Sequence, residues 1–324
     1  MPGSSFLRPL VLLVLAGMVA VLVAISVGSS HIGFAKVLWV FAGGGSELDR
    51  TLILDLRLPR VLSAFVVGGL LAVAGALMQV LLRNPLADPY VLGLSGGAAV
   101  GALLAMLAGT AGFIVSGSAF AGAMLATLLV FGLAHGSGSW TPSRLLLTGV
   151  VVAAGWGALI TLILAMTPAA RLPGMLYWLM GDLSHSGQPW PGLLVLVLVC
   201  LLVLPLGRSL NVLARGSMQA AALGVSVRPL EWLIYLLASV LTATAVTMAG
   251  AVGFVGLVVP HMLRLVLGND QRLILPACAL AGGILLVLAD TVARIVIAPE
   301  QLPVGVITAL LGVPTFLYLL YRSR

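Results

Sequence analysis

The sequence of 324 residues is 61% hydrophobic and only 8% charged, whereas an ordinary soluble domain is about 25% charged. A mean hydropathy of +1.21 and several apolar runs near the ~20 residues that cross a bilayer exclude a water-soluble fold. The net charge of +7 comes from arginines scattered between the apolar runs, which argues against a nucleic-acid partner.

Hydropathy and helix-breaking residues predict an all-α polytopic membrane protein of about ten transmembrane helices, in a single transmembrane domain over residues 1–324. A cleaved signal peptide is the alternative for the first run, although its apolar stretch is longer than a typical signal core. The loops leave no room for a separate catalytic domain. The predicted spans are 7–28, 61–82, 90–109, 112–134, 144–166, 191–206, 230–249, 250–267, 273–297 and 303–321.

Charge on the connecting segments predicts the orientation. With a cytoplasmic N-terminus, ten of the 16 lysines and arginines lie inside and six lie outside. Because cytoplasmic segments carry the excess of positive charge, both termini are expected on the cytoplasmic side of the inner membrane. The six outer residues are Lys36, Arg50, Arg57, Arg60, Arg171 and Arg294.

Small residues recur at four-residue spacing in two of the predicted spans. This spacing is typical of helices that pack closely, and a substrate-lining face is the alternative. The two stripes are Gly93, Gly97, Gly101 and Gly149, Ala153, Gly157. Similar small-residue triplets at 74–76 and 249–251, in spans of opposite predicted direction, indicate a weak inverted repeat.

The sequence has neither an ATP-binding motif nor an obvious coupling acid. Its only lysine, Lys36, is not part of a P-loop, so the chain is not expected to bind ATP. The four histidines are scattered and both cysteines lie in apolar runs, so no metal site, cofactor or catalytic group is predicted. No acid lies in the middle of a span, and Asp290 is expected to pair with Arg294. The pattern favours a pathway driven by a partner, and an ion-driven secondary carrier is the alternative.

Residues 207–229 form the most informative cytoplasmic segment. Asn211 is expected to cap a short helix that Gly216 ends, and Ser217 to begin a second helix that stops at Gly224. This arrangement predicts a compact docking element. An amphipathic helix on the lipid surface is the alternative, but Gly216 interrupts its apolar face.

Several motifs resemble those of the permeases that import iron-siderophores, haem and cobalamin, which are type II ABC importers. They are RLPR at 57–60, RNPLADP at 83–89, GFVGLVVPH at 253–261 and LPVGV at 302–306, and the resemblance extends from Asp55 to the C-terminus. It implies the type II permease fold, with ten helices in a homodimer or pseudo-dimer. It also implies two ATP-binding cassette subunits, which use ATP and Mg, and an extracytoplasmic substrate-binding protein.

The resemblance also implies roles for residues at both ends of the pathway. Arg57, Arg60 and Arg294 match the arginines that receive glutamates of the binding protein, with lipid or intramolecular pairing as the alternative. The family's coupling motif aligns with Arg215, Gly216, Ser217, Ala220, Ala221, Leu223 and Gly224, but Ser217 replaces its acid and Arg215 replaces a leucine. The cytoplasmic gate aligns with Asn84, Leu86, Thr141, Pro142 and Ser143, and Pro142 replaces a hydroxylated residue.

Residues 176–181 bear on the substrate. This stretch resembles the cobalamin-importing members locally, and Tyr177 and Trp178 are candidates for the pathway. An ordinary aromatic belt at the membrane interface is the alternative. The sequence therefore favours cobalamin over an iron-siderophore, with haem third.

Overall fold

The computed structural model describes residues 3–28, 32–134, 141–184 and 186–322, and every regular element in these ranges is helical. The longer helices are α1 (Gly3–Ser26), α4 (Leu58–Leu81), α5 (Leu94–Leu107), α6 (Phe113–Ala134), α7 (Pro142–Met166), α9 (Trp190–Val203), α12 (Val227–Ala249), α13 (Val255–Leu267), α14 (Gln271–Ile295) and α15 (Val304–Arg322). The shorter elements are α2 (Phe34–Phe41), α3 (Glu47–Arg50), η1 (Thr51–Arg57), η2 (Pro89–Leu92), α8 (Leu172–Met180), η3 (Leu204–Leu206), α10 (Gly207–Leu213) and α11 (Ser217–Ala222).

The ten long helices correspond to the ten predicted spans. Seven spans in the described residues are long and apolar enough to cross a membrane. Three shorter apolar helices, Leu94–Leu107, Val255–Leu267 and Val304–Leu319, supply the remaining positions. The prediction of an all-α polytopic fold is therefore confirmed.

The boundaries of the second span were predicted incorrectly. Its helix does not begin near residue 61, because α3, the π-helical η1 and α4 run on without a break from Glu47 to Leu81. Pro59 lacks the N–H that an α-helix would use, and it is the second residue after the π-helical stretch. The prediction also missed α2 and α8, which are too short to show in hydropathy.

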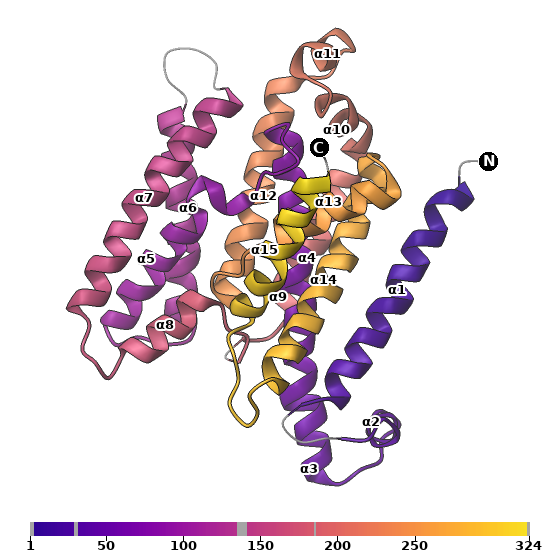
Figure 1. The fold of residues 1–324 in the computed structure, drawn as a ribbon, viewed down its shortest axis with the longest axis vertical. Helices are drawn as coiled ribbons and strands as arrows, with labels where there is room; N and C mark the ends of the chain where they lie inside the picture. The colour runs from indigo at the N-terminus through magenta and orange to yellow at the C-terminus, as the bar shows by residue number, and fades with distance from the viewer. Residues whose placement is uncertain (1–2, 29–31, 135–140, 185, 323–324) are drawn as a thin grey trace.

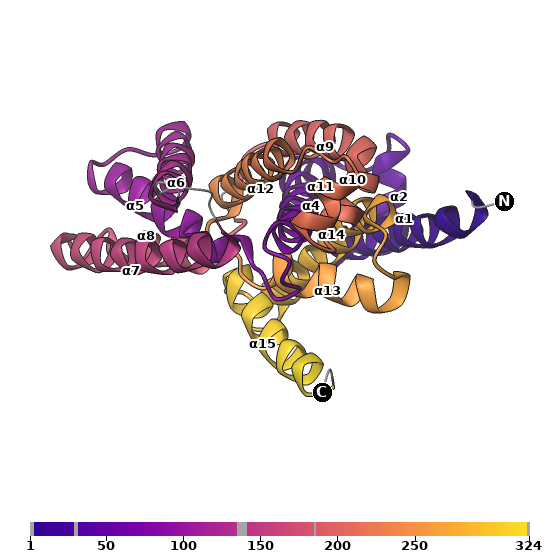
Figure 2. The same ribbon diagram turned by 90° about the horizontal axis from the view of Figure 1, so that it is seen from above.

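Helix α4 is the central element of the fold. In the span that contains α4, 89% of the most apolar 18-residue stretch is buried inside the protein, whereas in α7 the corresponding share is 17%. Its neighbours are α12, α13 and α14, and α1 packs on the far side of α14 (Figure 1). Helices α5 to α8 form a group on the other flank, while α15 projects from the body (Figure 2). Most of the described apolar core therefore surrounds a single helix.

Glycines bring α4 into backbone contact with two neighbours. A Cβ atom on Gly75 would lie 1.8 Å from the carbonyl oxygen of Gly256, in the first turn of α13. A Cβ atom on Gly68 would lie 2.1 Å from the carbonyl oxygen of Gly282 in α14. No side chain larger than hydrogen fits at these positions, so the three helices approach at the closest distance that backbones permit.

The small-residue stripes behave as packing surfaces over most of their length. Gly97 and Gly101 contact the backbone of α6, and Gly149 contacts η2. Gly157 has no neighbour within 4 Å of an added Cβ, so the second stripe ends before it.

Different short helices lie at the two ends of the molecule. One end, called the α11 end, carries α10 and α11, and the opposite end, called the α3 end, carries α2 and α3 (Figure 1). Helix α1 begins and α15 ends in the half that contains the α11 end, as the predicted topology requires (Figure 1). Helices α4 and α12 run in opposite directions, but the inverted repeat stays a prediction.

The contact between α4 and α13 can be tested with Gly75→Ala. The added methyl group overlaps a backbone oxygen, so we expect a loss of roughly 1–3 kcal/mol or more, seen as a melting temperature several degrees lower in detergent. Gly157→Ala is the matched control and should leave the melting temperature unchanged or slightly raised. Equal melting temperatures for the two variants would contradict the contact.

Candidate functional site

The three arginines predicted to dock a binding protein lie together at the α3 end, around one carboxylate. The Arg60 Nη2 atom is 2.8 Å from Asp290 Oδ1, and the Arg294 Nε atom is 3.0 Å from Asp290 Oδ2. Asp290 is 1% exposed. The expected pair of Asp290 with Arg294 is confirmed, and Arg60 joins it from the first turn of α4.

Two of these arginines also bind the C-terminal end of α1. Arg57 Nη1 donates to the carbonyl oxygen of Ile25 at 2.7 Å. Arg294 donates to the carbonyl oxygens of Ala24 at 3.0 Å and Val27 at 3.1 Å. These carbonyls have no partners within their own helix, and the helix dipole there favours a positive charge. The arginines therefore anchor α1 to the core.

Exposure separates Arg60 from the other two arginines. Arg57 and Arg294 are buried, and the side chain of Arg294 is 6% exposed, whereas the side chain of Arg60 is 14% exposed. Arg60 Nη1 also donates to Gln301 Oε1, in the segment before α15, at 2.6 Å. Arg60 is therefore the most accessible of the three arginines.

Beside Arg60 is a cavity of about 620 Å³ at the α3 end. Tyr177, a predicted pathway residue, lines it and is 46% exposed. Trp178 does not line this cavity: it is partly buried, and its backbone carbonyl contacts Gly250. The lining residues are Asp55, Leu56, Pro59, Arg60, Tyr177, Asp182, Leu183, Ser184, Ser186, Glu300 and Gln301.

At the α11 end, residues 207–229 form two short helices, as predicted. Helix α11 starts at Ser217, and Gly216 and Gly224 have positive φ angles of 138° and 79° that favour glycine. The predicted cap was wrong: α10 begins at Gly207, and Asn211 lies inside it. The Asn211 side chain instead accepts from the backbone N–H of Gln271 and donates to Asp270.

The predicted coupling residues differ in accessibility. Ala220 is 0% exposed, so its side chain packs inside the segment and is not available to a partner. Arg215, Ala221 and Leu223 are exposed, and Gly216 and Ser217 are partly exposed. Met218, which sequence reasoning did not select, is 87% exposed.

The predicted gate residues occupy two segments at the α11 end. Asn84 Oδ1 accepts from the backbone N–H of Leu86 at 2.9 Å, which closes a turn after α4. Thr141 caps α7 by accepting from the backbone N–H of Arg144 at 3.3 Å. Pro142 occupies the first helical position, where a missing N–H costs nothing, and the exposed Ser143 follows it.

A polar cavity of about 550 Å³ brings the coupling segment and one gate segment together. Arg215 of the coupling segment and Asn84 of the gate both line it, whereas Thr141, Pro142 and Ser143 do not. Sequence reasoning missed the link between Asn211 and Asp270, which are 59 residues apart. The lining residues are Gln79, Val80, Arg83, Asn84, Pro85, Asn211, Ala214, Arg215, Arg264, Asn269, Asp270 and Gln271.

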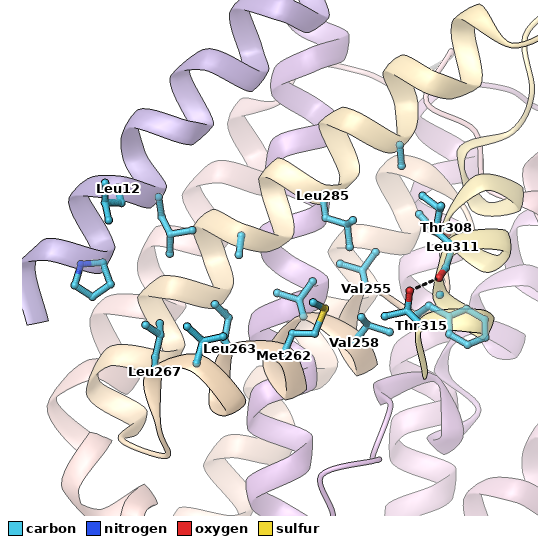
Figure 3. A pocket seen from close by; sticks show the side chains of 18 residues that line it. Leu12, Val255, Val258, Met262, Leu263, Leu267, Leu285, Thr308, Leu311 and Thr315 are labelled. Atoms are coloured by element: carbon cyan, nitrogen blue, oxygen red, sulfur yellow. Dashed lines mark hydrogen bonds between the residues drawn. The ribbon is translucent and has the colours of Figure 1, made fainter. Parts of the chain in front are cut away.

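An apolar cavity of about 560 Å³ lies between α1, α13, α14 and α15 (Figure 3). Leucine, valine and methionine side chains dominate its lining. The hydroxyls of Thr308 and Thr315 donate to carbonyls of their own helix, so neither hydroxyl has its proton available for a ligand. This cavity therefore has the character of a surface that contacts lipid or another helix, rather than of a recognition site.

The described residues contain no group of three His, Cys, Asp or Glu side chains placed to hold a metal ion. His31, His135 and His185 lie outside the described ranges.

The arrangement of helices and the sequence both match known proteins. The sequence matches the FecCD transport family over residues 13–322. The chain belongs to this family. It is 44% identical to the cobalamin import system permease protein BtuC of Halobacterium salinarum, over 87% of this chain and 76% of that protein. It is 39% identical to the hemin transport system permease protein HmuU of Yersinia pestis, over 96% of each.

A solved structure agrees with the fold. The chain superposes with a TM-score of 0.86 on a proposed metal-chelate type ABC transporter in an inward-facing conformation, with 29% sequence identity over 97% of this chain and 99% of that one. The resemblance inferred from the motifs is confirmed, and the chain is an ABC transporter permease that crosses the membrane several times.

The arginine cluster can be tested with Asp290→Asn. The substitution removes the one carboxylate between Arg60 and Arg294 and leaves buried positive charge unpaired, which typically costs roughly 3–5 kcal/mol. We expect a large drop in melting temperature. The control is Lys36→Gln, which breaks the more exposed pair with Asp49 and should cost about 0–1 kcal/mol. Similar losses in the two variants would refute the assignment.

Asp88 provides a pH-dependent test of the gate segment. Burial raises the pKa of its carboxyl to about 6, from an ordinary value of 3.8. The folded protein therefore holds the proton more tightly than the unfolded chain, and the stabilisation present below pH ~4 is lost as pH rises through about 6. In the variant Asp88→Asn, the amide oxygen can still accept from the N–H of Tyr90, so the cap of η2 is kept while the titrating group is removed. The melting temperature of this variant should vary less between pH 4 and 6.5 than that of the wild type. Parallel profiles would contradict the shift.

Proposed function

We propose that this chain is the permease of an ATP-driven importer that carries a metal chelate from an extracytoplasmic binding protein into the cytoplasm. The family match over residues 13–322 carries the proposal. The sequence contains no P-loop, so ATP hydrolysis belongs to a separate subunit, and this chain is a non-catalytic translocation subunit that binds no cofactor.

The proposed cargo is cobalamin, an iron-siderophore or haem, with cobalamin favoured. The relatives named for cobalamin and hemin transport are 44% and 39% identical, which supports this class of chelate without separating its members. The polar cavity beside Tyr177 is the proposed entrance.

The proposed assembly contains two copies of this permease, or one copy and a paralogue, with two ATPase subunits. Helix α15 projects from the body and exposes apolar side chains, including Leu310, Leu317 and Tyr318 at 59–65% exposure (Figure 2). A second permease subunit would cover this surface. We place the α11 end and both termini in the cytoplasm of a cell with the protein in its inner membrane, because the positive charge is greater on that side.

The proposed cycle uses both ends of the molecule. A loaded binding protein docks at the α3 end, where Arg60 contacts it and Arg57 and Arg294 hold the local structure. ATP brings the two ATPase subunits together, and the segment 207–229 transmits their movement. Asn84 and Leu86, with Thr141 to Ser143, then open or seal the cytoplasmic mouth. An ion-gradient-driven carrier is the competing function, and the lack of an acid in the middle of a span argues against it.

Docking at the α3 end can be tested with Arg60→Gln in proteoliposomes that contain the ATPase subunit. We expect the affinity for the binding protein to fall roughly 5- to 10-fold, with a weaker salt dependence, because one rim charge is lost. The permease dimer should stay intact. Unchanged binding would remove Arg60 from the interface.

The transport function itself is tested by offering cobalamin, ferric siderophores and haem in turn, each with its binding protein. Uptake is expected only with the ATPase subunit and ATP. Uptake by the permease alone under a proton gradient would instead support the secondary carrier.

A further inference from the structure

The polar cavity at the α11 end has an unbalanced charge. Its charged lining residues are Arg83, Arg215, Arg264 and Asp270. Two of these are already paired: Arg83 with Glu231 at 3.1 Å, and Asp270 with Arg272 at 2.6 Å. The remaining two arginines face the cavity without a carboxylate partner among the described residues, and they come from different parts of the chain.

Arg264 lies one turn before the end of α13 and reaches back to α4. Its Nη1 atom donates to Oε1 of Gln79, an amide that is only 4% exposed. Among the described residues no acid forms an ion pair with Arg264 or with the exposed Arg215. A partly buried guanidinium that is satisfied only by a neutral amide still bears a desolvation cost, so a negative group in the cavity would be stabilising.

We propose that this cavity receives a carboxylate side chain of the ATP-hydrolysing subunit, which binds Arg215 and Arg264 together. This inference rests on the proposed function. It adds a second contact with the ATPase subunit, beside the one that the exposed residues of the segment 207–229 would make. The planar guanidinium group of arginine can bind a carboxylate with two parallel hydrogen bonds. Two guanidinium groups from different elements therefore make a specific binding site for one Asp or Glu side chain.

The location of the cavity favours a protein over a lipid headgroup. Its walls come from the end of α4, from α10 and from the turn between α13 and α14. Seen from above, α10 and α11 lie over α4 and α14, at the end of the bundle rather than on its lipid-facing sides (Figure 2). The proposed partner approaches this same end.

Binding of a carboxylate to Arg264 would affect the gate segment through Gln79. The Nε2 atom of Gln79 donates to the carbonyl oxygens of Ala87 at 3.3 Å and Leu257 at 3.3 Å. Ala87 belongs to the segment that contains Asn84 and Leu86. A carboxylate that binds Arg264 competes with Gln79 for the guanidinium, so it would alter the hydrogen bonds that hold the gate segment against α13.

Carbodiimide cross-linking tests the proposal directly, because the reagent joins an amine to a touching carboxylate as an amide and is itself converted to a urea. The chain has a single lysine, Lys36, in α2 at the α3 end, so the wild-type permease offers no lysine at the α11 end, and the wild-type complex measures the background from amines of the ATPase subunit. In the complex with the ATPase subunit, Arg215→Lys should form a covalent product of the two chains. Arg8→Lys, on the exposed first part of α1 and outside both the cavity and the segment 207–229, is the matched control and should not.

A second variant examines the role of Arg264. Arg264→Gln replaces the guanidinium by a neutral amide and so removes the charge, and we expect ATP-dependent uptake to fall at least tenfold in complexes that assemble normally. Absence of the cross-linked product from Arg215→Lys, in a preparation whose wild-type counterpart transports, overturns the inference. A wild-type complex without ATP-dependent uptake would instead overturn the proposed function.

Discussion

The fold depends on the direct contact of backbones around α4. Gly75 against Gly256 and Gly68 against Gly282 leave no space for a side chain between α4 and its two neighbours. In a bilayer the hydrophobic effect does little to hold helices together, so close packing and hydrogen bonds must do so. Because α4 runs from the α3 end to the α11 end, the same contacts set the positions of Arg60 in its first turn and Asn84 just after its last.

The arginines at the two ends of α4 have different kinds of partner. At the α3 end Asp290 forms ion pairs with two arginines inside the protein, and the carbonyls of α1 accept hydrogen bonds from further donors. At the α11 end Arg264 has the neutral Gln79 as its described partner. Arginines that are held by a carboxylate and carbonyls of the same chain suit a structural anchor, whereas an arginine whose described partner is a neutral amide suits a surface that binds another molecule. The docking and coupling roles proposed for the two ends are consistent with this difference.

The features that depend on a local sequence pattern could be predicted from the sequence. Apolar length set the ten spans, Gly216 and Gly224 marked the ends of α10 and α11, and the i, i+4 spacing identified the pair of Asp290 with Arg294. Sequence reasoning failed where distant segments decide the outcome. Asn211 was predicted to be a cap because its preference for helix starts is local, but its side chain is held by Asp270 and Gln271 at the start of α14.

Burial explains the other differences. Ala220 matches a family motif, yet its side chain faces inward, and nothing in the motif distinguishes a position that touches the partner from one that supports it. The start of the second span was misjudged because Asp55, Arg57 and Arg60 look like loop residues. Two of these three are held by partners that only the folded chain provides.

The π-helical stretch Thr51–Arg57 has a consequence for how this part of the chain tolerates insertions and deletions. A π-helical turn holds one residue more than an α-helical turn, so it shifts the angular phase between the residues before it and those after it. Arg57 thus points to the end of α1 while Arg60 points to Asp290. Loss of a single residue here would restore a regular helix and would leave Asp49 close to its present orientation relative to α4, because the π-helical turn holds the extra residue. A one-residue deletion is therefore expected to disturb this stretch less than it would disturb the regular part of α4, where it would rotate the flanking residues by about 100° relative to each other.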